Sequence, residues 1–401
     1  MFIAKRFNSK IFKWLSIAFF VMTVIVYPSL LSLELPFLAS TSVELSVNAQ
    51  TARPDGQQDI KFDIAQAPAT SKGEEAEQKE KEVINFFSMA MGALAGLVLF
   101  IYGVTRLAEG LEQMGTERMK SFLSKCTTNR FAGVATGAVS TTLLESSSVT
   151  IIMVIAMVSA GVLTFVQSLS VVLGSNIGTA VGAQIISLDI KEYVPILMFA
   201  GLLLLFVGKT QTWKNIGIIL LGFGLMFYGL EAIDEAMKPF RNYQPFINLM
   251  KTLGTNPLLG ALLGAIFTVI IQSSSATVAI VITLASSGLI SLSAGVAIML
   301  GAEVGTCADT LVATLGRGRP ALRTGVFHLL FNVVSATLGI IFAPLLVQLV
   351  LSVSGGGVGR QIANAQILFN LIGVVAIIPF LPIVAQLLQR LIPNVPGDRQ
   401  L

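Results

Sequence analysis

Long apolar stretches separated by short polar connections make up most of this chain. Runs rich in Val, Ile and Leu reach the roughly 20 residues that a membrane-spanning helix requires. Their Gly, Pro and Ser content favours helices over the alternating strands of a membrane barrel. The pattern predicts an all-α, polytopic membrane protein. Spans are expected at residues 89–105, 165–188, 193–208, 215–232, 292–316, 324–350 and 363–389.

A polar cluster occurs twice within this apolar background, at 145–148 and at 272–275, an offset of 127 residues (272 − 145). Laid on each other at this offset, residues 128–188 and 255–315 are identical at nearly one position in three, mostly at glycines and hydroxyl residues. Weak internal repetition of this kind is typical of membrane transporters. The chain is therefore interpreted as an internal duplication.

The two stretches that hold these clusters, 131–160 and 258–287, are each about 30 residues long, which is short for two full spans and a turn. That length suffices for a re-entrant helical hairpin with the serines at its tip. Loop charge gives the orientation, because Lys and Arg gather on the cytoplasmic side. Basic residues follow the first core span, precede the span at 215–232 and return at Arg317, Arg319 and Arg323. The two halves are thus expected to be inverted repeats, with one hairpin entering from each side.

This predicted membrane topology divides the chain into five parts. Residues 1–49 combine basic residues, an apolar run and a small-residue cleavage pattern, which fits either a signal peptide or an uncleaved anchor. Residues 50–83 form a polar extracytoplasmic linker, 84–208 the first repeat, 209–350 the inverted second repeat, and 351–401 a final helix with a cytoplasmic tail. A multi-pass protein of the inner (plasma) membrane is expected.

Composition excludes several classes of protein. With 54% hydrophobic and 12% charged residues, the chain does not fit a soluble domain. Its net charge of +4 comes from loop bases that the positive-inside rule explains, so no nucleic-acid partner is expected. Cys126 and Cys307 lack a metal-binding or disulfide spacing, so no transition-metal site is expected.

The serine clusters predict an anion site. At a hairpin tip the second arm would start just after the serines, so its backbone amides and positive dipole end would face the protein centre. Serine and threonine hydroxyls can donate to an oxyanion or accept at a cation. The expected substrate-binding residues are Ser146, Ser147 and Ser148 at the first tip and Gln272, Ser273, Ser274, Ser275 and Thr277 at the second.

Coupled cations are expected because no Lys or Arg occurs at 131–190 or 252–316, and an unneutralised anion in a membrane core is costly. The glycine-containing segments 174–179 and 301–306 predict unwound backbone whose carbonyl groups coordinate Na⁺. The expected cation-coupling residues are Glu145, Thr150, Asn176, Thr179, Glu303 and Thr306. Asp309 adds a third core acid, and apart from the coupling ion no cofactor is expected.

Three elements resemble the bacterial branch of the type II sodium/phosphate cotransporter family. They are the Gln-Ser-Ser-Ser run at 272–275, the Gly-x-Asn-Ile-Gly-Thr pattern at 174–179 and the segment His-Leu-Leu-Phe-Asn at 328–332. The resemblance covers roughly 84–390 and implies a pseudo-symmetric core that carries inorganic phosphate with Na⁺. Phosphate as the substrate rests on this resemblance alone. Three residues depart from the family pattern: Glu145, Glu303 and Gln366 stand where Gln, Asn and His are usual.

Other functions stay open. A carrier of another anion, proton coupling, export instead of import, and a membrane regulator without transport all fit the pattern. An intramembrane hydrolase using a serine with His328 is disfavoured, because no Gly-x-Ser-x-Gly elbow is present and one nucleophile needs no duplication. His328 is expected to be a hydrogen-bonded packing residue. The expected partners are inorganic phosphate, Na⁺ and the lipid bilayer, and the oligomeric state is not predicted.

Overall fold

The computed structural model describes residues 85–188 and 190–394 of the chain, without the side chains of 116–118. The described residues all belong to one compact unit, Ile84–Leu401. The signal segment and polar linker expected before residue 84 lie outside the described residues.

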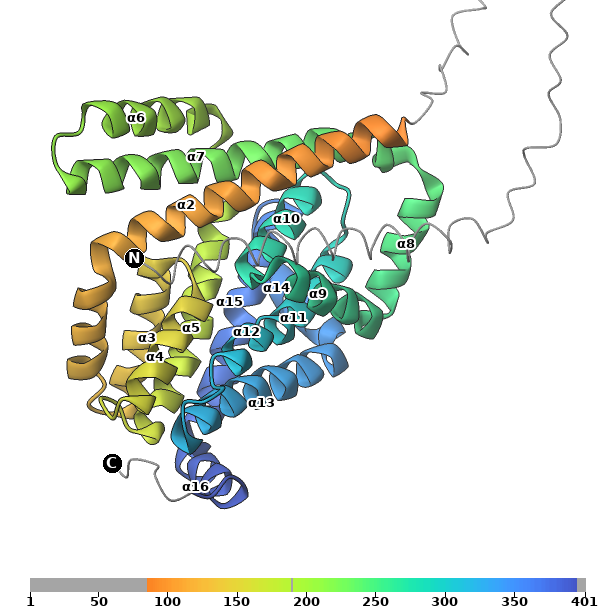
Figure 1. Ribbon diagram of the computed structural model, residues 1–401. Coiled ribbons are helices and arrows are strands. Elements are labelled where there is room, and N and C mark those ends of the chain that lie inside the picture. The colour runs from red at the N-terminus through yellow and green to blue at the C-terminus, as the bar shows by residue number, and fades with distance from the viewer. Residues whose placement is uncertain (1–84, 189, 395–401) are drawn as a thin grey trace, which may run out of the picture. The chain divides into compact units, whose positions relative to one another are not determined.

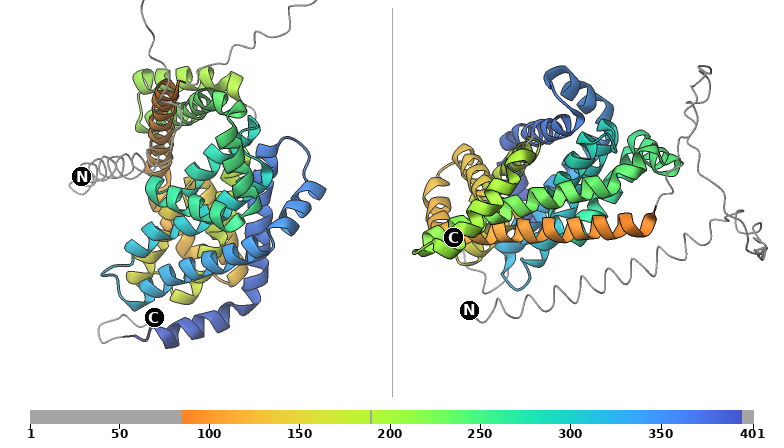
Figure 2. Two further views of the ribbon diagram at one scale, coloured as in Figure 1. Left: turned by 90° about the vertical axis from the view of Figure 1, so that its right-hand side faces the viewer. Right: turned by 90° about the horizontal axis from the view of Figure 1, so that it is seen from above.

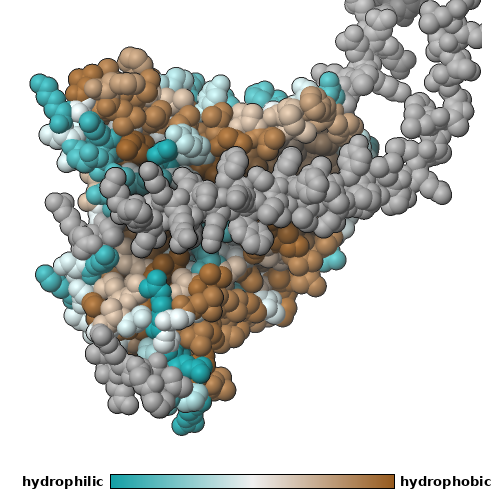
Figure 3. Space-filling view, in the orientation of Figure 1, coloured by the Kyte–Doolittle hydropathy of each residue, from teal (hydrophilic) through white to brown (hydrophobic). Residues whose placement is uncertain are grey.

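Every regular element in the described residues is a helix, as the apolar pattern predicts. Among the described residues, six helical segments are long and apolar enough to cross a membrane, or seven if the bent pair α8 (Gln244–Thr255) and α9 (Pro257–Ile271) is one span. Large apolar side chains such as Phe206 (81% exposed) and Leu315 (74% exposed) lie on the surface, and Figure 3 shows wide apolar areas on the face it draws. Such a surface suits lipid rather than water. The prediction of an all-α, polytopic membrane protein is confirmed.

The helices of the first half are α2 (Phe86–Cys126), α3 (Arg130–Leu144), α4 (Ser147–Ser159), α5 (Phe165–Ile186), the short 3₁₀ helix η1 (Lys191–Tyr193) and α6 (Val194–Val207). Those of the second half begin with α7 (Gln211–Met237), η2 (Lys238–Asn242), α8 (Gln244–Thr255), α9 (Pro257–Ile271), α10 (Ser274–Ser286), α11 (Leu292–Gly305) and α12 (Cys307–Val312). The chain continues through α13 (Arg319–Ile341), α14 (Ala343–Val353), α15 (Val358–Ile377), η3 (Ile378–Phe380) and α16 (Leu381–Leu391). α2 and α7 lie side by side, and α6 folds back along α7 (Figures 1 and 2).

The duplication extends to the backbone. α3 and α9 begin and end 127 residues apart, as do α4 and α10. Each pair is joined through a residue in the left-handed region, Glu145 (φ 50°, ψ 25°) and Gln272 (φ 60°, ψ 28°), which are the only non-glycine residues with positive φ among those described. We call 145–148 the first tip and 272–275 the second tip.

The glycine segment at 174–179 does not unwind, so that prediction is wrong for the first half. α5 is continuous through it, because its glycines allow close packing against α3. A β-carbon at Gly174 would lie 2.0 Å from the carbonyl oxygen of Val134. In the second half the expected break is confined to one residue, Thr306, between α11 and α12. Gly301 packs on α9 as Gly174 packs on α3.

Two expected spans also differ from the observed helices. The stretch 324–350 is two helices, because Pro344 has no N–H to continue α13. α6 has 14 residues, too few to cross a bilayer alone. The stretch 363–389 lies within the candidate span Val358–Leu391, which consists of α15, η3 and α16. In addition, α8 was not expected; it bends by 106° into α9.

Candidate functional site

The serine tips are helix N-caps. The hydroxyl oxygen of Ser146 accepts a hydrogen bond from the amide of Val149 (3.2 Å), and that of Ser273 accepts from the amide of Ala276 (3.1 Å). The first serine of each tip is therefore engaged in its own helix. The backbone amides in the first turn of α4 and of α10 have no carbonyl partner within their own helix. They are directed out of the helix end, and this arrangement binds anions.

The remaining tip residues divide between buried and accessible positions. Ser147 (5% exposed) and Ser274 (3% exposed) are buried, whereas Ser148 and Ser275 are half-buried. Thr150 and Thr277 are fully buried, and each hydroxyl donates to the carbonyl oxygen of the capping serine at 3.1 Å. The structure therefore gives both predicted threonines a role in holding the tip, and the two tips do so in the same way.

Each tip lies against the other half of the protein. α4 contacts α12, and α10 contacts α5. The hydroxyl of Ser148 lies near the carboxylate of Asp309 in α12. The sequence identified Asp309 as a core acid but gave no partner for it, because the contact joins residues far apart in the chain. The two halves thus interlock at the tips.

The tips differ in their leading residue. Glu145 is half-buried and its carboxylate lies over Gly182 of α5, where a β-carbon would be 2.7 Å from Oε2. Asp309 holds the position equivalent to Gly182 in the second half (309 − 182 = 127). The side chain of Gln272 is exposed, and its backbone N–H donates to the backbone carbonyl oxygen of Thr268 (2.6 Å). Only the first tip carries its own carboxylate.

The other predicted cation residues lie on the third helix of each half. Asn176 of α5 is 1% exposed and donates from Nδ2 to Oδ1 of Asn332 in α13, at 3.4 Å. The hydroxyl of Thr179 donates to the carbonyl of Ser175 in its own helix (3.1 Å). Thr306 is 4% exposed and lies between α11 and α12. All three are buried, but they are on different helices from the tip serines.

Glu303 has partners that the sequence did not assign to the site. Its Oε1 accepts hydrogen bonds from Nε2 of Gln366 (2.8 Å) and Nδ2 of Asn370 (3.2 Å), both on α15. The signal that pointed to them is the Phe-Asn pair that occurs at 331–332 and again at 369–370. The histidine of the first such segment, His328, is fully buried, and its Nδ1 lies 2.8 Å from the hydroxyl of Thr310. It fits the predicted packing role.

Comparison with known proteins decides the family. The profile of the Na⁺/Pi-cotransporter family matches residues 99–235 and then 242–375, more than half of the chain. The chain belongs to the Na⁺/Pi-cotransporter family. The resemblance drawn from its serine tips is therefore confirmed, and the family is one of transporters.

Relatives of this cotransporter-family chain come from bacteria and animals. YqeW of Bacillus subtilis (strain 168) is 27% identical over 297 residues, which cover 74% of this chain and 96% of YqeW. YjbB of Escherichia coli (strain K12), whose name proposes inorganic phosphate export, is 26% identical over 77% of this chain and 57% of YjbB. The sodium-dependent phosphate transport protein 2B of Homo sapiens is 31% identical over 132 residues, or 30% of this chain and 19% of that protein. This chain thus spans little more than half of YjbB. No solved structure was found to match it.

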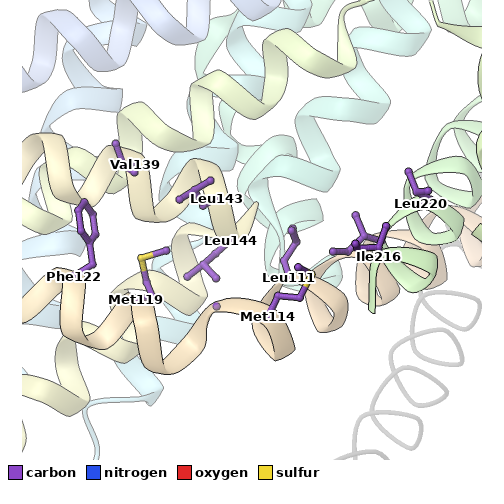
Figure 4. A pocket seen from close by; sticks show the side chains of 11 residues that line it. Leu111, Met114, Met119, Phe122, Val139, Leu143, Leu144, Ile216 and Leu220 are labelled. Atoms are coloured by element: carbon purple, nitrogen blue, oxygen red, sulfur yellow. The ribbon is translucent and has the colours of Figure 1, made fainter. Parts of the chain in front are cut away.

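A cavity of about 490 Å³ in this Na⁺/Pi-cotransporter family member lies between α2, α3 and α7 (Figure 4). No tip serine is among its lining residues, although Leu144, which lines it, directly precedes the first tip. Leu111, Met119, Phe122 and Leu143 are among its lining side chains, and the rest are also apolar apart from Gly115. A carbon-lined cavity cannot replace the hydration of a phosphate ion. We therefore place the candidate anion site at the helix ends of the tips.

Proposed function

We propose that this protein is a secondary active transporter that carries inorganic phosphate in symport with Na⁺ across the inner (plasma) membrane. The observation that carries the proposal is the pair of capped helix ends, at Ser146 and Ser273, in a chain whose family transports phosphate with sodium. Amides at a helix N-terminus stabilise an anion without a basic side chain. Ser146, Ser147, Ser148, Gln272, Ser273, Ser274, Ser275 and Thr277 would contact the phosphate.

The need for Na⁺ follows from charge. The core segments 131–190 and 252–316 contain no Lys or Arg, yet they hold Glu145, Glu303 and Asp309. A phosphate dianion entering such a core meets further negative charge, which is costly at low dielectric unless cations enter with it. Na⁺ would be coordinated by Glu145, Thr150, Asn176, Thr179, Glu303 and Thr306.

We further propose that the two halves are inverted repeats whose tips are re-entrant hairpins. Two contacts support this orientation. The hydroxyl of Ser159, at the end of α4, donates to the backbone carbonyl of Arg317 (2.8 Å), and both residues are expected at the cytoplasmic side. The hydroxyl of Ser287, at the end of α10, bonds Asp234 of α7, and both are expected outside. Equivalent hairpin ends therefore contact segments that the charge pattern assigns to opposite sides.

Transport assays on purified protein in proteoliposomes test the function. An inward Na⁺ gradient is expected to drive accumulation of radiolabelled phosphate, and replacing Na⁺ by K⁺ should abolish it. A proton gradient imposed without Na⁺ identifies proton coupling instead. Phosphate that fails to accumulate under either gradient would rule out symport of phosphate in both forms.

Export is the second candidate, because the name of YjbB proposes it. A symporter moves its substrates in the direction set by their combined gradients, so the same protein can run outward. Vesicles loaded with labelled phosphate separate the cases. If efflux occurs under an inward Na⁺ gradient and does not respond to its reversal, the protein is an exporter without Na⁺ coupling.

A further inference from the structure

A second polar cluster, which includes none of the tip serines, lies where α11 meets α15. Glu303 is 1% exposed, Gln366 0% and Asn370 1%. All three side chains are thus out of contact with solvent, and a carboxylate in such a place needs compensation for its lost hydration. The NH₂ groups of the two carboxamides supply it, since both donate to Oε1 of Glu303.

The carboxamide oxygens of this cluster have no hydrogen-bond partner within the described part of the chain. They are Oε1 of Gln366 and Oδ1 of Asn370, and both are fully buried. A buried polar atom without a partner is expensive and rare, and it calls for a specific reason. Two such oxygens on neighbouring side chains beside one carboxylate point to a ligand that is bound through oxygen.

The equivalent cluster around Asn176, where α5 meets α13, supplies an internal control. Asn176 is the equivalent of Glu303 (303 − 176 = 127), and His328 and Asn332 of α13 correspond to Gln366 and Asn370 of α15 (366 − 328 = 38; 370 − 332 = 38). There the carboxamide of Asn332 is fully engaged. Its oxygen accepts from Asn176, and its nitrogen donates to the carbonyl of His328 (3.0 Å). Among the carboxamides of the two equivalent clusters, the unpartnered oxygens therefore belong to the cluster that contains Glu303.

We propose that Glu303, Gln366 and Asn370 form a Na⁺ site between α11 and α15. The proposal deepens the Na⁺ coupling argued above and rests on it only for the identity of the ion. A half-turn of a carboxamide exchanges its oxygen and its NH₂ group. With both turned, two oxygens take places now held by nitrogens 2.8 and 3.2 Å from Oε1 of Glu303. Three oxygens so close together repel one another unless a cation lies among them.

The charge of the site selects a monovalent ion. Oxygen ligands of this kind suit hard cations. One carboxylate and two neutral carboxamides balance a single positive charge, whereas a divalent ion would leave an excess charge in an apolar interior. Without the ion, the NH₂ groups stabilise the carboxylate; with it, the carboxamide oxygens and the carboxylate share the cation. The same three side chains therefore serve both states.

Binding of radiolabelled Na⁺ to the purified full-length protein, without phosphate, tests the site. Glu303→Gln is expected to remove one bound Na⁺ per chain or to weaken its binding by about tenfold or more. The matched control is Asn364→Ala, which removes another α15 carboxamide whose partners are Gln184 and Ser354. It should bind Na⁺ like the unchanged protein. Because phosphate is absent from the assay, the result does not depend on which anion is transported.

Gln366→Glu separates a cation ligand from a structural hydrogen-bond donor. If Gln366 only donates to Glu303, the substitution places two carboxylates together, so the unfolding temperature falls and adding Na⁺ rather than K⁺ does not restore it. If Gln366 is a ligand, Na⁺ binding persists and the protein becomes more strongly stabilised by Na⁺ than by K⁺ at equal ionic strength. Na⁺ bound by Glu303→Gln with unchanged affinity and stoichiometry, or loss of Na⁺-specific stabilisation in Gln366→Glu, would overturn the proposal.

Discussion

Glu145 and Gln272 hold equivalent backbone positions with different chemistry. Both adopt a left-handed conformation that costs a non-glycine residue roughly 1–2 kcal/mol. Strain that recurs in two copies next to the serines is consistent with a functional position. Glu145 lies over Gly182, which has no side chain to exclude it, whereas Gln272 is exposed. The first tip therefore directs a carboxylate towards α5, whereas the second tip has an exposed carboxamide.

We expect Glu145→Gln to alter cation dependence more than phosphate affinity, because it removes a charge next to α5 while keeping the shape of the side chain. Loss of an interaction with a charged group costs about 1.5–3 kcal/mol, which corresponds to a shift of roughly ten- to hundredfold in the Na⁺ concentration for half-maximal phosphate uptake. Glu109→Gln is the control, because Glu109 pairs with Arg106 on a partly exposed face of α2. Unchanged Na⁺ dependence together with unchanged phosphate affinity in Glu145→Gln would remove this residue from the cation path.

At the scale of elements, the glycines at 174–178 and at 301 allow close packing between helices, whereas the sequence analysis predicted that they would mark unwound backbone. Gly174 lies against Val134 and Gly178 against Ala138, so α3 and α5 touch through their backbones. The second half repeats the contact through Gly301 and Ala261. A glycine pattern alone does not distinguish an unwound helix from a close helix pair, since both need a residue without a β-carbon.

Gly174→Ala should lower stability, because its β-carbon would lie 2.0 Å from a backbone oxygen that cannot move independently of its helix. Overpacking of this kind costs about 1–3 kcal/mol. Gly115→Ala is the matched control in α2, where the described residues beyond its chain neighbours and own helix turn place no atom within 4 Å of the added carbon and alanine is the better helix former. Thermal unfolding in detergent should show a lower midpoint for the first variant and an equal or higher one for the second. Equal midpoints for Gly174→Ala and the unchanged protein would contradict the packing account.

At the scale of the molecule, the sequence predicted the features that rest on composition and repetition. Hydropathy gave the all-α membrane fold, and the repeated serines gave the offset that α3, α4, α9 and α10 follow. The sequence did not predict which side chains of distant segments contact each other. Neither the proximity of Ser148 to Asp309 nor the hydrogen bond from Gln366 to Glu303 has a local signal, because each depends on how helices from different parts of the chain pack. The sequence analysis also did not predict the end of α13 and the start of α14, which are set by a single proline, Pro344.

The inverted arrangement of the two halves is the central claim of the account. A carrier must expose one site to each side in turn, and two hairpins inserted from opposite sides provide matching elements for that exchange. Ser159 and Ser286 are equivalent positions at the ends of α4 and α10 (286 − 159 = 127), so they must face opposite sides if the claim holds.

Thiol labelling in intact cells measures this directly. In a chain whose two cysteines, Cys126 and Cys307, are replaced by alanine, Ser159→Cys and Ser286→Cys are introduced separately. A membrane-impermeant maleimide is expected to label the Ser286→Cys protein in intact cells and the Ser159→Cys protein only after permeabilisation. Labelling of both proteins from the same side of the membrane would contradict the inverted-repeat architecture.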